Sequence, residues 1–176
     1  MGKIVIINGP NLNFLGQREI DKYGTTTYKE LISELEDYTN NQDKLIFYQS
    51  NHEGEICEFI QNIFNNETID GLIINPGGYT HTSVAIRDSL LLLNLPIVEV
   101  HMTDIRKREN FRKTNLIHDV CEESFVGLGI DGYKKGIDYI NEKWKNFLPG
   151  IKGLILWICI IRIISRLRIS LLQNLS

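Results

Sequence analysis

The feature that most constrains the fold of this chain is a regular alternation of short apolar runs with longer amphipathic segments. Each short run has four to seven residues and ends at polar or turn-forming residues, which is typical of strands covered on both faces. The predicted strands are residues 3–8, 44–50, 71–75, 96–101 and 124–127. Helical spacing, twice preceded by a Thr or Ser with Glu three residues later, predicts helices over residues 27–40, 50–66, 82–93 and 130–147.

Alternating strands and helices of these lengths predict an α/β fold, with a parallel sheet between two layers of helices. Five strands suit the flavodoxin-like order 2-1-3-4-5. Residues 1–150 contain no repeat and no low-complexity linker, so we expect a single domain there. In such folds ligands bind beyond the carboxyl ends of the strands, and this rule directs the search for functional residues.

The charged residues are distributed unevenly along the chain. Residues 1–150 hold 15 basic and 22 acidic side chains, whereas the last 26 residues hold four basic and no acidic ones. An acidic body of this kind argues against nucleic acid as a partner.

The three cysteines, Cys57, Cys121 and Cys159, are odd in number and widely spaced. They predict neither a disulfide framework nor a zinc site, and we expect reduced thiols. The chain opens directly into a strand without the layout of a signal peptide, which predicts a cytoplasmic location.

Polar residues gather just beyond the first, third and fourth predicted strands, where they should converge on one cleft. The clusters are residues 8–11 with the loop to Tyr23 and Gly24, residues 75–83, and residues 99–103 followed by Arg112. The loop of residues 9–25 lacks periodicity, and loops of that length inside a compact domain are usually functional.

Glu99 and His101 lie two residues apart on a strand, so their side chains share one face. A carboxylate beside an imidazole can fix its tautomer and raise its pKa, which suits a proton donor near neutral pH. The same spacing also fits an ion pair at a strand end with no catalytic role.

Tyr23 is a candidate base in the long loop. A phenol ordinarily titrates near about pH 10, so a phenolate at neutral pH requires nearby cations. Arg18 lies five residues earlier in the same loop and Arg112 follows the fourth strand, so either could supply the charge. A loop tyrosine can equally be a surface or packing residue.

The turn formed by Asn75, Gly77 and Gly78 presents backbone amides beside a helix start, which can hold a carboxylate or another anionic oxygen. A plain strand-to-helix turn has the same appearance. His81 on this turn is either a ligand contact or a structural residue.

No metal or cofactor is predicted. The four histidines show no ligand spacing, and the glycine-rich nucleotide motifs and the serine-nucleophile motif are absent from the sequence. A flavin-binding electron carrier of the same fold would need phosphate-binding residues where Pro10, Asn11 and Leu12 stand. A phospho-receiver domain would need acids in place of Asn8 and Asn75.

Taken together, the segments resemble the type II 3-dehydroquinate dehydratases. The resemblance covers about residues 3–147, with the motifs in the order and spacing of the family. The matching strings are INGPNLNFLGQRE with Tyr23 and Gly24, QSNHEGE, INPGGYTHTSVAIRD, VEVH, RENFRKTN and VGLGIDGY.

The resemblance implies a catalytic domain that eliminates water from 3-dehydroquinate to give 3-dehydroshikimate, in the shikimate pathway or in quinate breakdown, with no cofactor or metal. It also implies a homo-oligomer, a dodecamer built as a tetramer of trimers. Tyr23 would remove the proton next to the ketone and His101 would protonate the departing hydroxyl. Arg18 would stabilise the tyrosinate and Asn11 would help to hold the enolate oxygen. The implied substrate-binding positions are Asn75, His81, the backbone of Met102 and Thr103, Arg112 and, from a neighbouring subunit, Asp88.

Residues 151–176 lie outside the family pattern and form an apolar, basic extension. Their uncharged stretch, residues 153–161, is shorter than the roughly 20 residues that a bilayer span requires. Arg162, Arg166 and Arg168 also weigh against a span. A basic amphipathic helix on a membrane or on another subunit is one alternative. We favour a non-native extension, such as translation past the usual stop.

Overall fold

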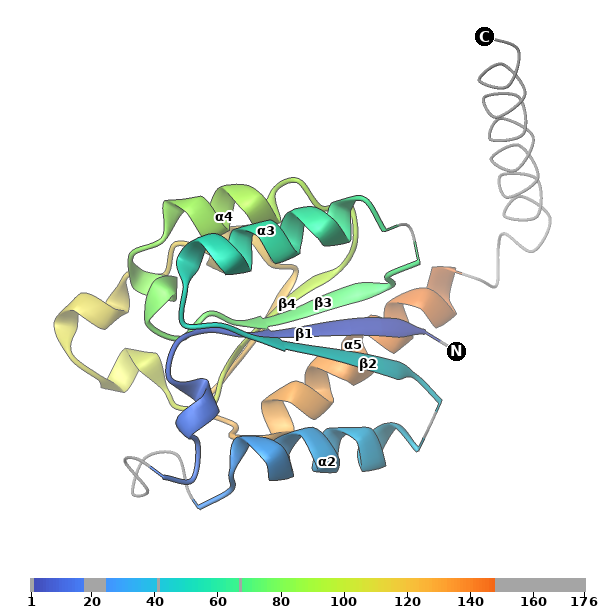
Figure 1. The fold of residues 1–176 in the computed structure, drawn as a ribbon, viewed down its shortest axis with the longest axis horizontal. Helices are drawn as coiled ribbons and strands as arrows, with labels where there is room; N and C mark the ends of the chain where they lie inside the picture. The colour runs from blue at the N-terminus through green and yellow to red at the C-terminus, as the bar shows by residue number, and fades with distance from the viewer. Residues whose placement is uncertain (1, 18–24, 41, 67, 148–176) are drawn as a thin grey trace, which may run out of the picture. The chain divides into compact units, whose positions relative to one another are not determined.

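The computed structural model describes residues 2–17, 25–40, 42–66 and 68–147 of the chain (Figure 1). Its centre is one parallel sheet of five strands in the order β2-β1-β3-β4-β5. The strands are β1 (Lys3–Asn8), β2 (Lys44–Gln49), β3 (Gly71–Asn75), β4 (Ile97–His101) and β5 (Glu123–Val126). The predicted α/β class and the predicted flavodoxin-like strand order are both confirmed.

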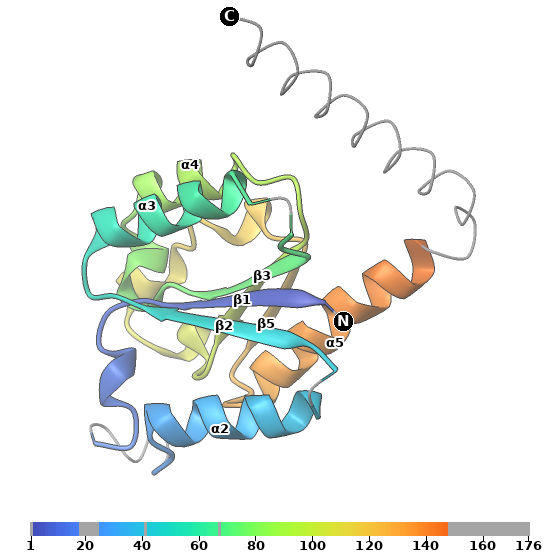
Figure 2. The same cartoon turned by 45° about the vertical axis from the view of Figure 1, so that its right-hand side comes forward.

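The helices form a layer on each face of the sheet (Figures 1 and 2). They are α2 (Tyr28–Thr39), α3 (Glu53–Phe64), α4 (Val84–Leu90) and α5 (Asp131–Phe147). Helices α3 and α4 pack on one face in one core cluster, and α2 and α5 pack on the other face in a second.

The continuous apolar run of β1 follows from this double coverage. Ile4 and Ile6 pack in the cluster with α2 and α5, whereas Val5 and Ile7 pack in the cluster with α3 and α4. All four side chains are almost completely buried. Since successive residues of a strand point to opposite faces, a strand covered on both sides needs apolar residues at every position.

One of the two predicted capping boxes is confirmed. The Thr27 hydroxyl accepts from the Glu30 amide at 3.2 Å, and the Glu30 carboxylate accepts from the Thr27 amide at 2.8 Å. The box predicted at Ser50 is wrong, because α3 starts two residues later than that spacing implies. The Ser50 hydroxyl instead accepts from the His52 amide and donates to the Glu55 carboxylate.

Helix α4 begins after Ser83, whose hydroxyl accepts from the Ile86 amide. It ends at Leu90, not near the predicted residue 93. Residues 91–93 continue with the tighter bonding of Leu92 to Ser89 and Leu93 to Leu90 before the chain reaches Pro96, which cannot extend a helix.

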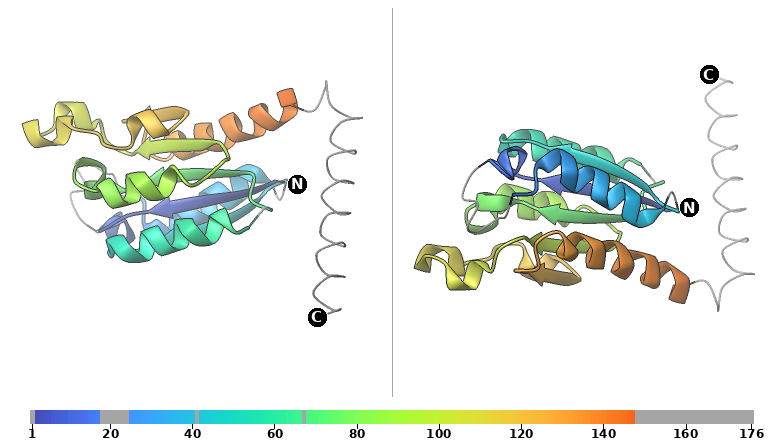
Figure 3. Two further views of the ribbon diagram at one scale, coloured as in Figure 1. Left: turned by 90° about the horizontal axis from the view of Figure 1, so that it is seen from above. Right: turned by 90° about the horizontal axis from the view of Figure 1, so that it is seen from below.

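The carboxyl ends of the strands carry the irregular segments of the fold. The loop after β1 forms η1 (Leu12–Phe14), and β3 leads into η2 (Gly77–His81). Three further 3₁₀ turns follow β4, namely η3 (Ile105–Lys107), η4 (Asn110–Lys113) and η5 (His118–Val120). Figure 3 shows η3 and η4, in yellow, beyond the end of β4.

The chain divides into two compact units, residues 1–141 and 142–176. The first unit contains the whole sheet, and of the second only residues 142–147 are described. The predicted boundary near residue 150, the extension beyond it and Cys159 lie outside the described residues. Within the described part of the chain, no helix is both long enough and apolar enough to cross a bilayer. Cys57 and Cys121 are half-buried free thiols.

Gly9 joins the ends of β1 and β3, and its replacement by alanine should destabilise the protein. Its amide donates to the Asn75 carbonyl at 2.8 Å, and a Cβ there would lie 2.3 Å from the carbonyl oxygen of Pro76. Because both segments are fixed by the sheet, we expect Gly9→Ala to lower the free energy of unfolding by about 2–3 kcal/mol in chemical denaturation. Gly54→Ala is the control, since a Cβ on that exposed residue of α3 meets no atom within 4 Å. Equal stability of the two variants would contradict the close approach.

Candidate active site

A pocket of about 390 Å³ opens at the carboxyl ends of β1, β3 and β4. It contains nine of the residues singled out from the sequence, which come from all three predicted clusters. They are Asn11, Asn75, Gly77, Gly78, His81, His101, Met102, Thr103 and Arg112. Residues far apart in the chain therefore face one cavity, as expected for the strand ends of a parallel sheet.

The other candidates lie elsewhere. Glu99 is fully buried behind His101 and does not line the pocket. Asp88 is exposed on α4, away from the lining of the pocket in its own chain. Arg18 and Tyr23 lie outside the described residues. Of the described residues that flank them in the chain, Gly16 and Thr25 lie so close together that a Cβ on Gly16 would lie 2.5 Å from the Thr25 carbonyl oxygen.

Five further lining residues were not assigned a catalytic or binding role from the sequence. They are Pro10, Leu12, Ile105, Arg108 and Glu109. A signal for Arg108 did exist, because it lies four residues before Arg112 in the same charged stretch. Arg106 in that stretch instead pairs with Asp104 at 2.9 Å, and sequence spacing does not separate the two arginines.

The centre of the site is the pair of His101 and Glu99 on β4. The Nε2 of His101 lies 2.5 Å from Oε1 of Glu99, and both side chains are buried. Because an ionised carboxylate only accepts, Nε2 carries the proton of this bond. Nδ1 is then the ring nitrogen left to exchange a proton with a ligand in the pocket.

Glu99 is held in its charged form. Burial alone raises the pKa of this carboxyl, but hydrogen bonds from His101, Asn115 and Ser124 outweigh it, so that the pKa lies below its ordinary value. An ionised Glu99 fixes the tautomer and the orientation of His101, so that Nδ1 is the nitrogen available to a ligand.

His81 faces the pocket as a neutral imidazole. Burial lowers its pKa more than the bond to the Thr114 carbonyl raises it, and the charges of Arg112 and His101 lower it further. Nδ1 donates to that carbonyl at 2.7 Å. Nε2 is consequently an acceptor, suited to a ligand hydroxyl.

The arginines of the pocket share one acid. Nε of Arg112 lies 2.8 Å from the Glu109 carboxylate, and Nε of Arg108 lies 3.5 Å from it. Guanidinium groups on this wall of the pocket can donate to an anionic ligand.

A buried polar layer supports the turn after β3. The Tyr133 hydroxyl donates to Asn8 at 2.6 Å and accepts from Asn75 at 2.9 Å. Asn75 also accepts from the Gly77 amide at 3.3 Å, and Gly77 has a φ of 58°, a conformation that favours glycine. The Asn75 side chain at the pocket is thus held from two sides.

Among the described residues, no three His, Cys, Asp or Glu side chains gather as a metal site. The pocket instead combines a buried acid–base pair with hydrogen-bonding groups and guanidinium groups. Such a set can move protons and bind an anion.

The strand order and the strand-end pocket define a flavodoxin-like α/β protein with proton-transfer groups at its ligand site. A family model described as class II dehydroquinase matches residues 2–141. The chain belongs to this family, the type II 3-dehydroquinate dehydratases. The matched range coincides with the compact unit that contains the sheet and the pocket. Family membership excludes the two alternative classes of protein, the flavin carrier and the phospho-receiver domain.

Individual relatives support the same assignment. A 3-dehydroquinate dehydratase from Fusobacterium nucleatum is 48% identical over 143 residues, which cover 80% of this chain and 97% of the relative. One from Halothermothrix orenii is 45% identical, with 80% of this chain and 94% of the relative covered. The crystal structure of a type II dehydroquinase from Butyrivibrio crossotus matches with a TM-score of 0.76 at 44% identity, covering 80% of this chain and 97% of that chain.

Replacing Glu99 with glutamine should reduce stability in a pH-dependent manner. Because the folded protein holds the carboxyl pKa below its ordinary 4.5, the charged group stabilises the fold above that pH and the contribution is lost as the pH falls through the lowered value. We expect Glu99→Gln to lower the free energy of unfolding by about 1–3 kcal/mol at neutral pH, and by less in acid. Urea denaturation across this range measures the difference. A loss of unfolding free energy that did not change with pH would contradict a charged Glu99.

Proposed function

We propose that this chain eliminates water from 3-dehydroquinate to give 3-dehydroshikimate, with His101 as the proton donor and Tyr23 as the base. The observation that carries the proposal is the buried His101–Glu99 pair at a pocket that also holds two arginines. Membership of the type II dehydratase family identifies the reaction.

The reaction needs a base and an acid. A base removes the proton next to the ketone, which leaves an enolate, and the hydroxyl β to the ketone then departs with its C–O electron pair as the double bond forms. His101 gives this hydroxyl a proton from Nδ1, so that water leaves instead of hydroxide. The negative charge on the enolate oxygen must be met by donors that are already in place. The backbone amide of Asn11 donates to the Asn51 side chain at 2.8 Å. Asn11 lines the pocket, and its side-chain amide is the proposed donor to the enolate oxygen.

Tyr23 is preferred as the base over the tyrosines packed beneath the strand ends. Burial raises the pKa of Tyr28 and of Tyr133, which keeps both phenols protonated at neutral pH. Tyr23 belongs to the segment that is joined to the chain beside η1, whose Leu12 lines the pocket. Arg18 on the same segment is the proposed cation that favours the tyrosinate.

The substrate is a carboxylate with several hydroxyl groups. His81 can accept from a hydroxyl through Nε2, and Arg112 supplies positive charge in the same pocket. The Met102–Thr103 backbone and the Asn75 side chain are proposed to bind the remaining polar groups, and the turn at Gly77 and Gly78 leaves room for the ligand. No cofactor or metal enters this proposal.

Assembly is part of the proposal. We infer a homo-oligomer, a dodecamer formed from trimers, in which exposed Asp88 on α4 reaches the pocket of a neighbouring subunit. Residues 1–150 would be the catalytic domain, active in the cytoplasm, and residues 151–176 would contribute nothing to the chemistry.

Mixing the purified protein with 3-dehydroquinate and following the ultraviolet absorbance of the conjugated product tests the function directly. We expect His101→Ala and Tyr23→Phe each to lower kcat by about 10²–10⁴-fold, since each removes one partner in proton transfer. Circular dichroism should show both variants folded. Absence of product with the wild-type protein would refute the reaction, and near-normal turnover in either variant would remove that residue from its role.

A chain ending at Gly150 tests the domain boundary and the assembly. We expect kcat and KM within about twofold of the full-length values, because the extension contributes no residue to the proposed site. Light scattering should give the same dodecameric mass for both chains. A large loss of activity, or a change of mass, would show that the extension has a role of its own.

A further inference from the structure

The Glu99 carboxylate accepts hydrogen bonds from two donors besides His101. Oε1 accepts from His101 at 2.5 Å and also from Nδ2 of Asn115 at 2.7 Å. Oε2 accepts from the hydroxyl of Ser124 at 3.0 Å. Each carboxylate oxygen is therefore tied to a neutral donor that comes from a different segment of the chain.

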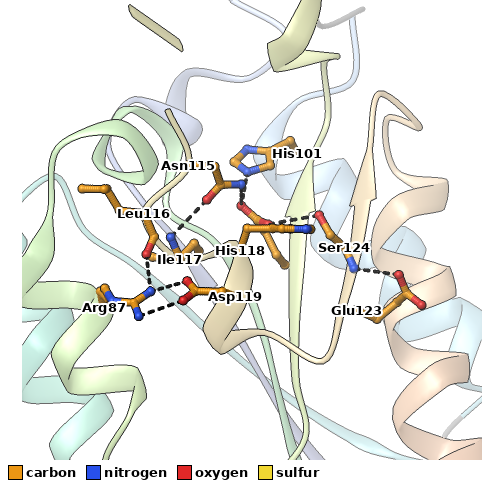
Figure 4. Close-up of polar contacts among 10 residues, drawn as sticks. Arg87, His101, Asn115, Leu116, Ile117, His118, Asp119, Glu123 and Ser124 are labelled. Atoms are coloured by element: carbon orange, nitrogen blue, oxygen red, sulfur yellow. Dashed lines mark hydrogen bonds and ion pairs between the residues drawn. The ribbon is translucent and has the colours of Figure 1, made fainter. Parts of the chain in front are cut away.

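Asn115 is itself held in place. Its Oδ1 accepts from the Ile117 amide at 3.1 Å, which directs the Nδ2 group toward Glu99 (Figure 4). The Leu116 carbonyl accepts from Arg87 of α4 at 2.8 Å, and Arg87 also forms two bonds with Asp119. The segment after η4 is thereby fastened to α4 directly after its contact with Glu99.

Ser124 reaches Glu99 through the register of the sheet. It is the direct partner of Glu99 in the pairing of β4 with β5. Neighbouring residues in register point to the same face, so the hydroxyl on β5 stands beside the carboxylate on β4. Figure 4 shows Asn115 and Ser124 approaching this position from opposite sides of the strand that bears His101.

We propose that Asn115 and Ser124 are positioning residues of the reaction, which fix the Glu99 carboxylate so that it holds His101 in the proton-donating orientation. The proposal rests on the proposed function for the role of His101 as an acid. A buried carboxylate tied at only one atom could rotate or take up a proton, and in either case it would release the imidazole. Donors on both oxygens prevent both outcomes.

Other titratable groups also face this pair. His118 approaches Oε2 of Glu99 at 3.4 Å with its ring 68% exposed, so it meets water as well. Burial raises the pKa of the Cys121 thiol, and the Glu99 charge adds to the effect. His81 lies on the pocket side of His101. Their contacts with the pair are longer or less direct than the hydrogen bonds from Asn115 and Ser124.

The test uses the full chain with Ser124→Ala, Asn115→Ala and the double variant. We expect each single variant to lower kcat about tenfold with KM within about threefold, because the substrate contacts remain in place. In the double variant Glu99 takes up a proton more readily and stabilises the imidazolium less. The alkaline limb of the pH–rate profile should then move to lower pH by about half a unit or more. Ser124→Thr keeps the hydroxyl and should recover most of the turnover lost in Ser124→Ala.

Thr39→Val is the matched control, since it removes a buried hydroxyl that bonds only the Glu36 carbonyl on α2. Its kcat and pH profile should match the wild type. Nitrogen-15 spectra of the histidines give a readout that does not require activity. In its neutral form, His101 should show one tautomer in the wild type and a mixture of both tautomers in the double variant. An unmoved limb with an unchanged tautomer would overturn the proposal even if kcat fell. Failure of the wild-type protein to dehydrate 3-dehydroquinate would refute the proposed function but leave the tautomer measurement intact.

Discussion

A single buried negative charge organises the functional end of this fold. Glu99 has no exposed surface and lies on β4 between two neighbouring strands, where an unpaired carboxylate would be very costly. Three hydrogen-bond donors, from β4, β5 and the segment after η4, compensate for that cost. The charge can therefore remain in the interior and act on His101, which lines the pocket.

Much of this architecture can be read from the sequence because the rules involved are local. Apolar runs such as residues 71–75 predict buried strands, and the alternation of elements predicts a parallel sheet, for which five strands suit the order 2-1-3-4-5. Parallel strands end at one edge, so the candidate residues that follow three of them were expected to meet, and nine of these candidates line one pocket. The Glu99–His101 contact needed only the two-residue period of a strand.

The remainder depends on contacts that no local pattern encodes. Residues 103–121 form three short 3₁₀ turns without periodicity, so the sequence did not distinguish Arg108 in the pocket from Arg106 outside it. Ser124 looks like an ordinary surface residue until the register of β5 is known, and Asn115 does so until the path of the segment after η4 is known. The capping box expected at Ser50 is absent because the Ser50 hydroxyl donates to Glu55, two residues beyond the expected Glu53.

The position of Ser124 on β5 has a consequence for how the protein matures. β5 is an edge strand of the sheet, and because it is the last strand in the sequence it is also the last one to leave the ribosome. A nascent chain that has assembled the first four strands already possesses the imidazole and its carboxylate, yet one oxygen of that carboxylate still lacks its hydroxyl donor. The support of the proton donor is thus completed late, when the edge strand docks and the Ser124 hydroxyl reaches the carboxylate.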